Sequence, residues 1–93
     1  MVNYKEIEQK FEQVLSLLND DLQQQEIDQV CLEFYVGEWV LALESLCAIL
    51  YEKNVSISPE VYHLLQEIGL NLEASQDTWQ CIQLQVVVEE ETE

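Results

Sequence analysis

Apolar residues recur at intervals of three and four along four successive stretches of this chain, and that spacing restricts its fold more than any other feature. One face of an α-helix has this period, whereas a half-buried strand alternates at every second residue. The stretches span residues 2–18, 22–36, 38–53 and 59–72. With two glycines and one proline, the chain also lacks the turn residues that a many-stranded sheet requires. The sequence predicts an all-α fold, a small bundle of four to five helices.

The predicted core is the apolar stripe of each stretch. Its members are Tyr4, Ile7, Phe11, Val14, Leu15 and Leu18, then Ile27, Val30, Cys31 and Phe34, then Trp39, Leu43, Leu46, Cys47 and Leu50, and finally Val61, Leu64, Leu65, Ile68 and Leu72. The third stripe is the widest, so we expect the third helix to be central.

Local signals mark the ends of these helices. Asn19, Asp20 and Asp21 offer N-cap chemistry to the second helix. Gly37 stands where a left-handed helix end favours a residue without a side chain. Ser58 followed by Pro59 is a strong helix start, since it joins an N-cap residue to a proline in the first turn.

The segment 77–88 is ambiguous between helix and strand. Asp77 resembles an N-cap before a short helix, but Ile82, Leu84 and Val86 alternate with glutamines as in a strand. We expect a short helix, because a lone strand has no partner in a helical bundle. Residues 1–88 then form a single domain, and residues 89–93 form a solvated acidic tail.

The charge of the chain is almost entirely negative. Nineteen acidic residues face only Lys5, Lys10 and Lys53, which gives a net charge of −16. Such a surface repels itself, attracts cationic partners, and disfavours nucleic-acid phosphate and anionic lipid. The sequence therefore predicts a basic protein partner, no direct nucleic-acid binding and no membrane association.

Residues with catalytic or metal-binding chemistry are sparse. Cys31, Cys47 and Cys81 have no metal-binding or redox spacing, so we interpret them as small core residues in a reducing cytoplasm. His63 falls opposite the apolar stripe of its helix and is expected to face solvent. No calcium-binding loop or phosphate-binding glycine loop occurs. We therefore expect no catalytic residue, no cofactor and no metal, and we place the protein in the cytoplasm because no signal peptide is evident.

The second predicted helix and its ends concentrate the acidic side chains. No lysine or arginine occurs between residues 13 and 52. We predict that a partner binds the acidic residues Asp20, Asp21, Glu26, Asp28, Glu33 and Glu38, with Tyr35 as an aromatic anchor at the rim.

Residues 34–87 resemble the MafI family of bacterial immunity proteins, small cytoplasmic partners of polymorphic toxins. The resemblance is carried by Glu38-Trp39, Ala42-Leu43-Glu44-x-Leu46-Cys47, Leu50-Tyr51-Glu52, Ile57-x-x-x-x-Tyr62 and Trp79, and it covers a little over half of the chain. It implies a helical fold and an immunity function in contact-dependent growth inhibition or a related system.

The toxins bound by such proteins are frequently nucleases, including EndoU-type ribonucleases. The resemblance and the charge together predict an immunity protein that neutralises a basic toxin domain, in particular a ribonuclease, by covering its active site or substrate-binding surface. Two alternatives remain open: a small acidic secretion chaperone that masks an apolar segment of an exported protein, and a thiol or histidine enzyme. The sequence leaves the oligomeric state open.

Overall fold

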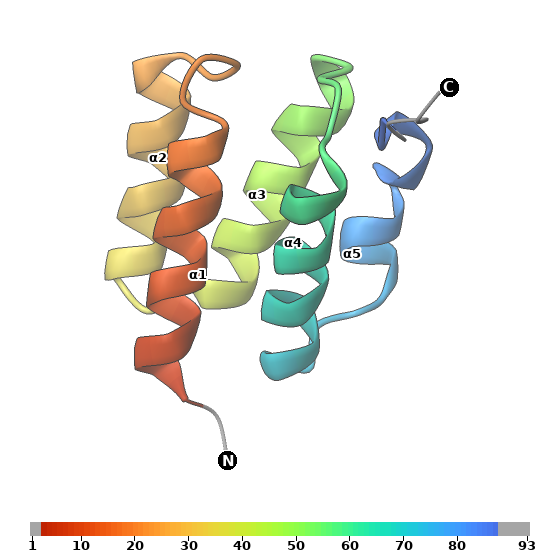
Figure 1. Ribbon diagram of the computed structural model, residues 1–93. Coiled ribbons are helices and arrows are strands. Elements are labelled where there is room, and N and C mark those ends of the chain that lie inside the picture. Colours follow the sequence, from red (N-terminus) through yellow and green to blue (C-terminus); the bar gives the residue numbers. More distant parts are fainter. Residues whose placement is uncertain (1–2, 88–93) are drawn as a thin grey trace.

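Five α-helices make up most of residues 3–87 (Figure 1). The structure, a computed structural model, describes residues 3–87, so residues 88–93, and with them the expected acidic tail, lie outside the described part. The helices are α1 (Tyr4–Leu17), α2 (Gln24–Tyr35), α3 (Trp39–Glu52), α4 (Pro59–Asn71) and α5 (Asp77–Gln80), followed by a 3-10 turn at Gln83–Gln85. The all-α prediction is confirmed, and the four long helices begin and end within two residues of their predicted limits.

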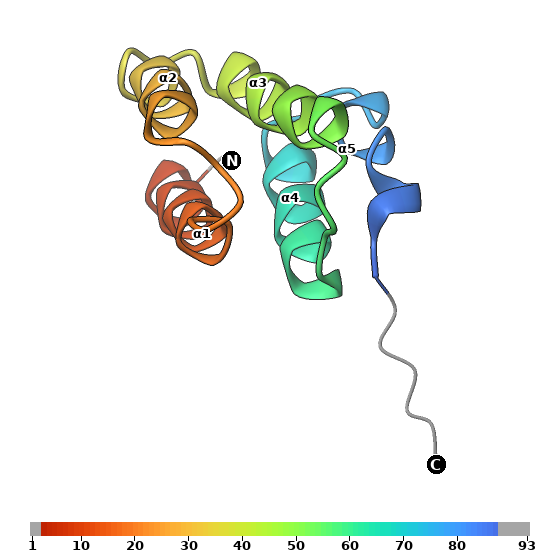
Figure 2. The same cartoon turned by 90° about the horizontal axis from the view of Figure 1, so that it is seen from above.

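The four long helices form two layers, as Figure 2 shows from above. In one layer α1 packs against α4, and in the other α2 packs against α3. Helix α3 also contacts α4, and α5 packs against both of them. Although α1 and α2 are consecutive in the sequence, they meet through side chains, with the rings of Phe11 and Phe34 centred 4.8 Å apart.

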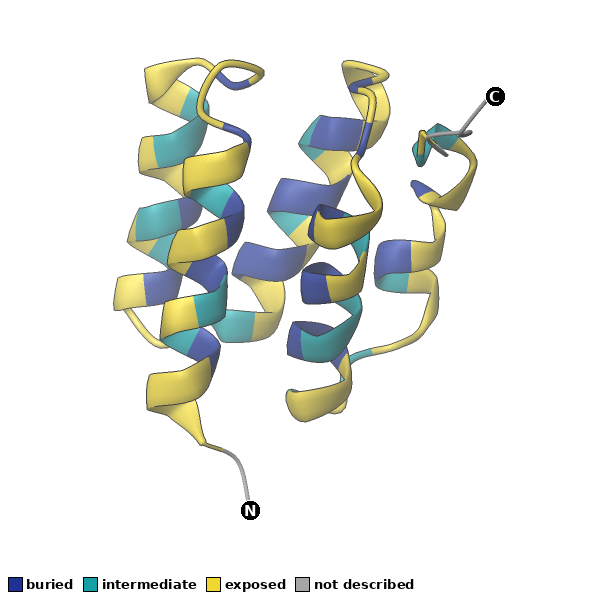
Figure 3. Cartoon of the chain, in the orientation of Figure 1, coloured by how far each residue is buried: buried dark blue, intermediate teal, exposed yellow. Residues whose placement is uncertain are grey.

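The core lies between the layers, where the apolar stripes of the helices converge (Figure 3). Its largest fully buried side chains are Trp79, Ile7, Leu43, Leu46, Leu50, Ile57, Leu65, Ile68 and Ile82. Among the described residues no polar or charged residue is buried. The helices therefore associate through apolar burial, at about 25 cal/mol per Å² of apolar surface removed from water.

Several helix ends follow the sequence signals, and one does not. Ser58 Oγ accepts a hydrogen bond from the Val61 backbone N at 3.2 Å and caps α4, and Gly37 has a φ of 88° after α2, in the left-handed region. The expected capping of α2 by Asn19, Asp20 or Asp21 is wrong, because the chain runs on to Gln23 before the helix begins.

Gly69 lies inside α4 because the Trp79 indole packs directly against its backbone. A Cβ at residue 69 would overlap the six-membered ring of Trp79. Glycine costs up to about 1 kcal/mol relative to alanine in a helix interior. The absence of a side chain at Gly69 allows α5 to approach α4 closely, and Trp79 is thereby buried to an exposed fraction of 1 %.

The described part of the ambiguous segment, residues 77–87, combines a short helix with an extended stretch. The short helix α5 is present, although its N-cap is Gln76 and Asp77 is its first residue. Beyond it, Val86 forms a single parallel bridge with Ile57, and the Ile57 backbone N donates to Gln85 O at 2.9 Å. The strand-like alternation therefore marks a short extended contact with the α3–α4 connection.

Gln85 fastens this segment to the end of α3. Its side-chain Nε2 donates to the carbonyl oxygens of Leu50 and Val55, each at 2.9 Å. The last carbonyls of a helix have no partner within the helix itself. Gln85 thus gives the Leu50 carbonyl oxygen a second donor, beside the Val55 backbone N at 3.1 Å, and also donates to the Val55 carbonyl oxygen in the following loop.

Candidate partner-binding surface

Helix α2 carries acidic side chains on two opposite flanks. Glu26 and Glu33 are seven residues apart and share the flank facing α3, where Glu26 meets Lys53. Asp28 is two residues from Glu26, which places it on the flank facing α1. Cys31, three residues after Asp28 on the helix, lines a depression together with Glu12 of α1. The acidic residues of α2 therefore do not form one cluster.

Glu26 is engaged within the fold. Its Oε1 accepts a hydrogen bond from Lys53 Nζ at 2.8 Å and another from the backbone N of Gln23 at 2.9 Å. These two bonds, the lysine bond first, lower the pKa of Glu26. The absence of lysine between residues 13 and 52 does not leave Glu26 without a cation, because Lys53 at the end of α3 folds back onto the first turn of α2.

Glu33 has one satisfied and one unsatisfied carboxylate oxygen. Oε2 accepts a hydrogen bond from Gln29 Nε2 at 3.0 Å, one helical turn away. Oε1 is buried and has no hydrogen-bond partner within residues 3–87. A carboxylate oxygen in this state gains from a new donor more than a hydrated one does.

A narrow depression separates α1 from α2. Its lining residues are Phe11, Glu12, Leu15, Cys31, Phe34 and Tyr35. The floor is aromatic, since the Phe11 and Phe34 rings pack at a tilt of 51° and the Tyr35 ring meets Phe34 edge-on at 6.1 Å. Glu12 is one of the lining residues, and Asp28 lies three residues before Cys31, about one helical turn away. The depression therefore joins an apolar floor to a negatively charged rim.

The solvent side of α2 exposes three large apolar residues in its last two turns. Leu32, Tyr35 and Val36 are 61 %, 70 % and 64 % exposed. Their spacing of three and four residues places them side by side on the helix surface. We call these three residues the α2 strip. Tyr35, the expected aromatic anchor, belongs to it and also lines the depression beside α1.

The remaining predicted site residues lie beyond the ends of α2. Asp20 and Asp21 are exposed in the α1–α2 connection. Glu38 is exposed at the N-cap of α3, past the opposite end of α2. A helix of 12 residues is about 18 Å long, so Asp20 and Asp21 follow α1 near one end of that length and Glu38 lies at the other. The predicted site is a surface running the length of α2.

Three residues of this surface were not singled out in the sequence. Glu12 belongs to the first helix and reaches the site only through the packing of α1 beside α2. Leu32 and Val36 are an i, i+4 pair outside the core stripe, and this spacing in the sequence indicates two exposed apolar side chains on one helix face. Single exposed apolar residues are common, but the three residues of the α2 strip lie within five positions of one helix and form a patch.

Most carboxylates on the rest of the surface have no cation beside them. Lys10 Nζ lies 2.9 Å from Glu6 and 3.5 Å from Glu67, and Lys53 is held by Glu26. The other acidic side chains within residues 3–87 make no ion pair with a lysine. Two of the three lysines thus tie one helix to another, and the outward charge is left almost wholly negative.

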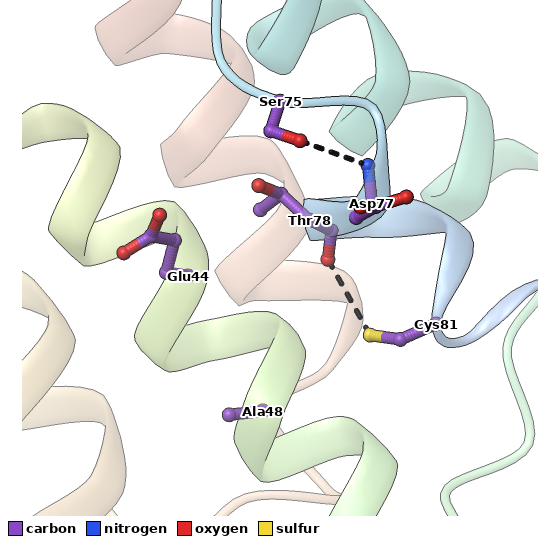
Figure 4. A pocket seen from close by; sticks show the side chains of 6 residues that line it. All are labelled: Glu44, Ala48, Ser75, Asp77, Thr78 and Cys81. Atoms are coloured by element: carbon purple, nitrogen blue, oxygen red, sulfur yellow. Dashed lines mark hydrogen bonds between the residues drawn. The ribbon is translucent and has the colours of Figure 1, made fainter.

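A second depression, of 380 Å³, lies between α3 and α5 (Figure 4). Glu44 and Ala48 of α3 face Ser75, Asp77, Thr78 and Cys81 across it. The Cys81 thiol donates to the Thr78 carbonyl oxygen at 3.4 Å, and partial burial raises its pKa. A thiol that stays protonated at neutral pH is a poor nucleophile.

The cysteines differ in their surroundings. Cys47 is buried in the core, and burial raises its pKa to about 12. Cys31 is half-buried and Cys81 is exposed, so the expectation that all three are core residues is wrong for Cys81. His63 faces solvent as predicted, with its Nε2 3.0 Å from Glu67 Oε2.

Within residues 3–87 no three His, Cys, Asp or Glu side chains are arranged to hold a metal ion. None of the helices in the same range is both long enough and apolar enough to cross a bilayer.

Comparison with known protein families, with curated proteins and with solved structures finds no match to this chain. The resemblance to the MafI family stays a prediction from the motif residues. Those residues now have positions in the fold: Glu38 and Trp39 open α3, and Trp79 packs on α4.

Proposed function

We propose that this protein is an immunity protein that acts in the cytoplasm and neutralises a basic toxin domain, in particular a ribonuclease, by covering its active site or substrate-binding surface. The observation that carries the proposal is the unpaired carboxylate surface, because lysine neutralises only Glu6, Glu26 and Glu67 within residues 3–87. An enzyme that binds RNA carries lysine and arginine where it holds phosphates, and a carboxylate surface competes for the same groups.

Charge of one sign on this scale favours fast capture. Electrostatic steering raises association rates by about 10-fold to 10³-fold at low ionic strength. An immunity protein needs fast capture because free toxin damages the cell before it is bound. Slow release depends on buried contacts, and Tyr35 of the α2 strip has the aromatic character that such anchors share.

The first experiment is co-expression with the product of the gene immediately upstream, followed by purification and a ribonuclease assay. We expect a stable complex in which nuclease activity is lost, and survival of cells that otherwise die from the toxin. Failure to form a complex or to protect cells from an adjacent toxin contradicts the proposal.

Charge reversal then tests the position of the surface. The triple variant Asp20→Lys, Asp21→Lys and Asp28→Lys changes exposed side chains around α2. None of them contacts a lysine within residues 3–87. Its matched control is Glu44→Lys, Glu73→Lys and Asp77→Lys, which changes the net charge equally but elsewhere on the molecule.

We expect the association rate to fall about 10-fold or more in the α2 variant, and by less in the control. The salt dependence of binding should also weaken in the α2 variant. Equal losses in both variants contradict the placement of the site around α2, while leaving a general role of the negative charge intact.

A secretion chaperone remains the second candidate, because the exposed α2 strip is the kind of surface that masks an apolar segment. A chaperone complex held by apolar contacts changes little with ionic strength, whereas capture of a basic toxin weakens as salt rises. Affinity measured over a range of salt concentrations distinguishes the two.

A further inference from the structure

We propose that the α2 strip docks a basic amphipathic helix, which packs its apolar stripe on Leu32, Tyr35 and Val36 and places lysine or arginine beside the flanking carboxylates. This inference rests on the proposed function, since it names the segment of the basic partner that is bound. The contact then lies on α2, where the partner buries apolar side chains and pairs its basic residues with carboxylates.

The apolar part of the argument is the geometry of the strip. Three large side chains that are 61 %, 70 % and 64 % exposed lie within five residues of one helix. Residues spaced by three and four form a continuous ridge that fits the apolar stripe of a second helix. The depression beside Tyr35 adds an apolar hollow with Phe11 and Leu15 on its far wall.

The charged part of the argument is the rim. Glu12 lines the depression between α1 and α2, and helical spacing places Asp28 toward that side. Glu33 shares the opposite flank with Glu26, which meets Lys53 of the α3 end. The Oε1 atom of Glu33 is buried without a hydrogen-bond partner within residues 3–87, so a lysine or arginine of the partner reaches it when the Glu33 side chain turns outward. A helix with basic residues on both sides of its apolar stripe complements this arrangement, and an acidic or neutral helix does not.

A second copy of the chain is a poor occupant of the same surface. Pairing two α2 strips brings Glu12, Asp28 and Glu33 of each copy close to those of the other, between molecules of net charge −16. Like charges placed opposite each other at an interface cost several kcal/mol. The rim therefore selects a basic partner over self-association.

The test uses the full chain and three synthetic peptides of about 16 residues, each labelled with a fluorophore. The first is an alanine-based helix with leucine at positions i, i+3, i+4 and i+7 and lysine on both flanks. The second has the same composition in scrambled order, which destroys the stripe. The third keeps the leucine stripe and replaces lysine by glutamate. Binding is followed by fluorescence anisotropy at low and high salt, and the contacted residues are mapped by amide chemical shifts.

Two variants with matched exposure locate the contact. Leu32→Gln removes the centre of the strip, and Leu70→Gln makes the same change on α4 at a leucine that is also 61 % exposed. We expect the striped basic peptide to bind about 10-fold tighter than the scrambled one, and Leu32→Gln to remove most of that difference. Leu70→Gln is expected to leave it unchanged, and the glutamate peptide is expected not to bind.

Other results overturn the inference in distinguishable ways. Equal, salt-sensitive binding of the striped and scrambled peptides refutes the docking of a helix, while the attraction of basic partners stands. If neither basic peptide binds at low salt, the protein does not attract basic partners, and the proposed function loses its basis as well. Sedimentation that shows a dimer lost in Leu32→Gln and kept in Leu70→Gln assigns the strip to self-association.

Discussion

Gly69 and Trp79 are in van der Waals contact through the glycine backbone, and no larger residue fits at position 69 while the indole keeps its place. The short helix α5 is attached to α4 at this point. One glycine therefore determines how closely the C-terminal part of the described chain approaches the core.

Replacement of Gly69 by alanine tests this contact. Alanine favours the helix by up to about 1 kcal/mol, but its Cβ overlaps the Trp79 ring, and overpacking of a core costs about 1–3 kcal/mol. We expect Gly69→Ala to lower the free energy of unfolding, measured by urea denaturation. The neighbouring exposed change Leu70→Ala should stay within about 0.5 kcal/mol of the parent. A stabilised Gly69→Ala variant contradicts the contact.

Gln85 provides a second attachment of the same segment. Gln85→Ala removes two hydrogen bonds and leaves the carbonyls of Leu50 and Val55 without this donor. We expect a loss of about 1–3 kcal/mol in the free energy of unfolding. The control is Gln83→Ala, two residues earlier in the same turn and exposed. If both variants lose the same stability, the Gln85 hydrogen bonds do not anchor the segment.

Glu26 makes stability depend on pH with a defined sign. Its pKa is lowered in the folded protein, so the ionised form stabilises the fold above the unfolded pKa of about 4.3, and this contribution disappears as pH falls through the lowered value. We expect Glu26→Gln to have a lower melting temperature than the parent at neutral pH, and the difference to shrink in acid.

Glu52→Gln is the control for this pH dependence. Glu52 is exposed on α3, and no lysine pairs with it within residues 3–87. Its neutralisation is expected to raise stability slightly at neutral pH by reducing repulsion. A Glu26→Gln variant that behaves like Glu52→Gln shows that the Lys53 pair contributes nothing.

Salt is expected to stabilise the folded state. A net charge of −16 repels itself, and raising ionic strength from about 0.1 M to 1 M shortens the screening length from about 10 Å to 3 Å. The melting temperature should rise with sodium chloride concentration in calorimetry. The rise should be smaller in a variant with Glu44→Gln and Glu73→Gln. A melting temperature that falls with salt indicates that ion pairs outweigh repulsion.

Local signals account for what the sequence could predict. The apolar period located four long helices, and Ser58 and Gly37 marked two of their ends correctly. The predicted capping of α2 is wrong because Asp20 and Asp21 lie within the α1–α2 connection, and Gln23 with Glu26 forms the capping box instead. The segment 77–88 stayed ambiguous because its extended part is defined by Ile57, far away in the sequence.

The candidate surface was predictable in composition and not in arrangement. Its acidic residues and Tyr35 could be read from the second helix alone. Lys53 pairs with Glu26 although the two residues are 27 positions apart, so Glu26 is not one of the unpaired carboxylates. Glu12 belongs to the surface although it lies on another helix. Helical spacing places Asp28 and Glu33 on different flanks, but only the packed neighbours show what each flank faces.

The pairing of α1 with α4 bears on the order of folding. Gln13 of α1 meets Glu60 of α4 across 47 positions, whereas α2 and α3 pack across a connection of a few residues. Closing the longer loop costs more chain entropy, so we expect α2 and α3 to form a hairpin early and α1 to dock late. Pulse-labelled hydrogen exchange during refolding should then protect amides of α3 before those of α1.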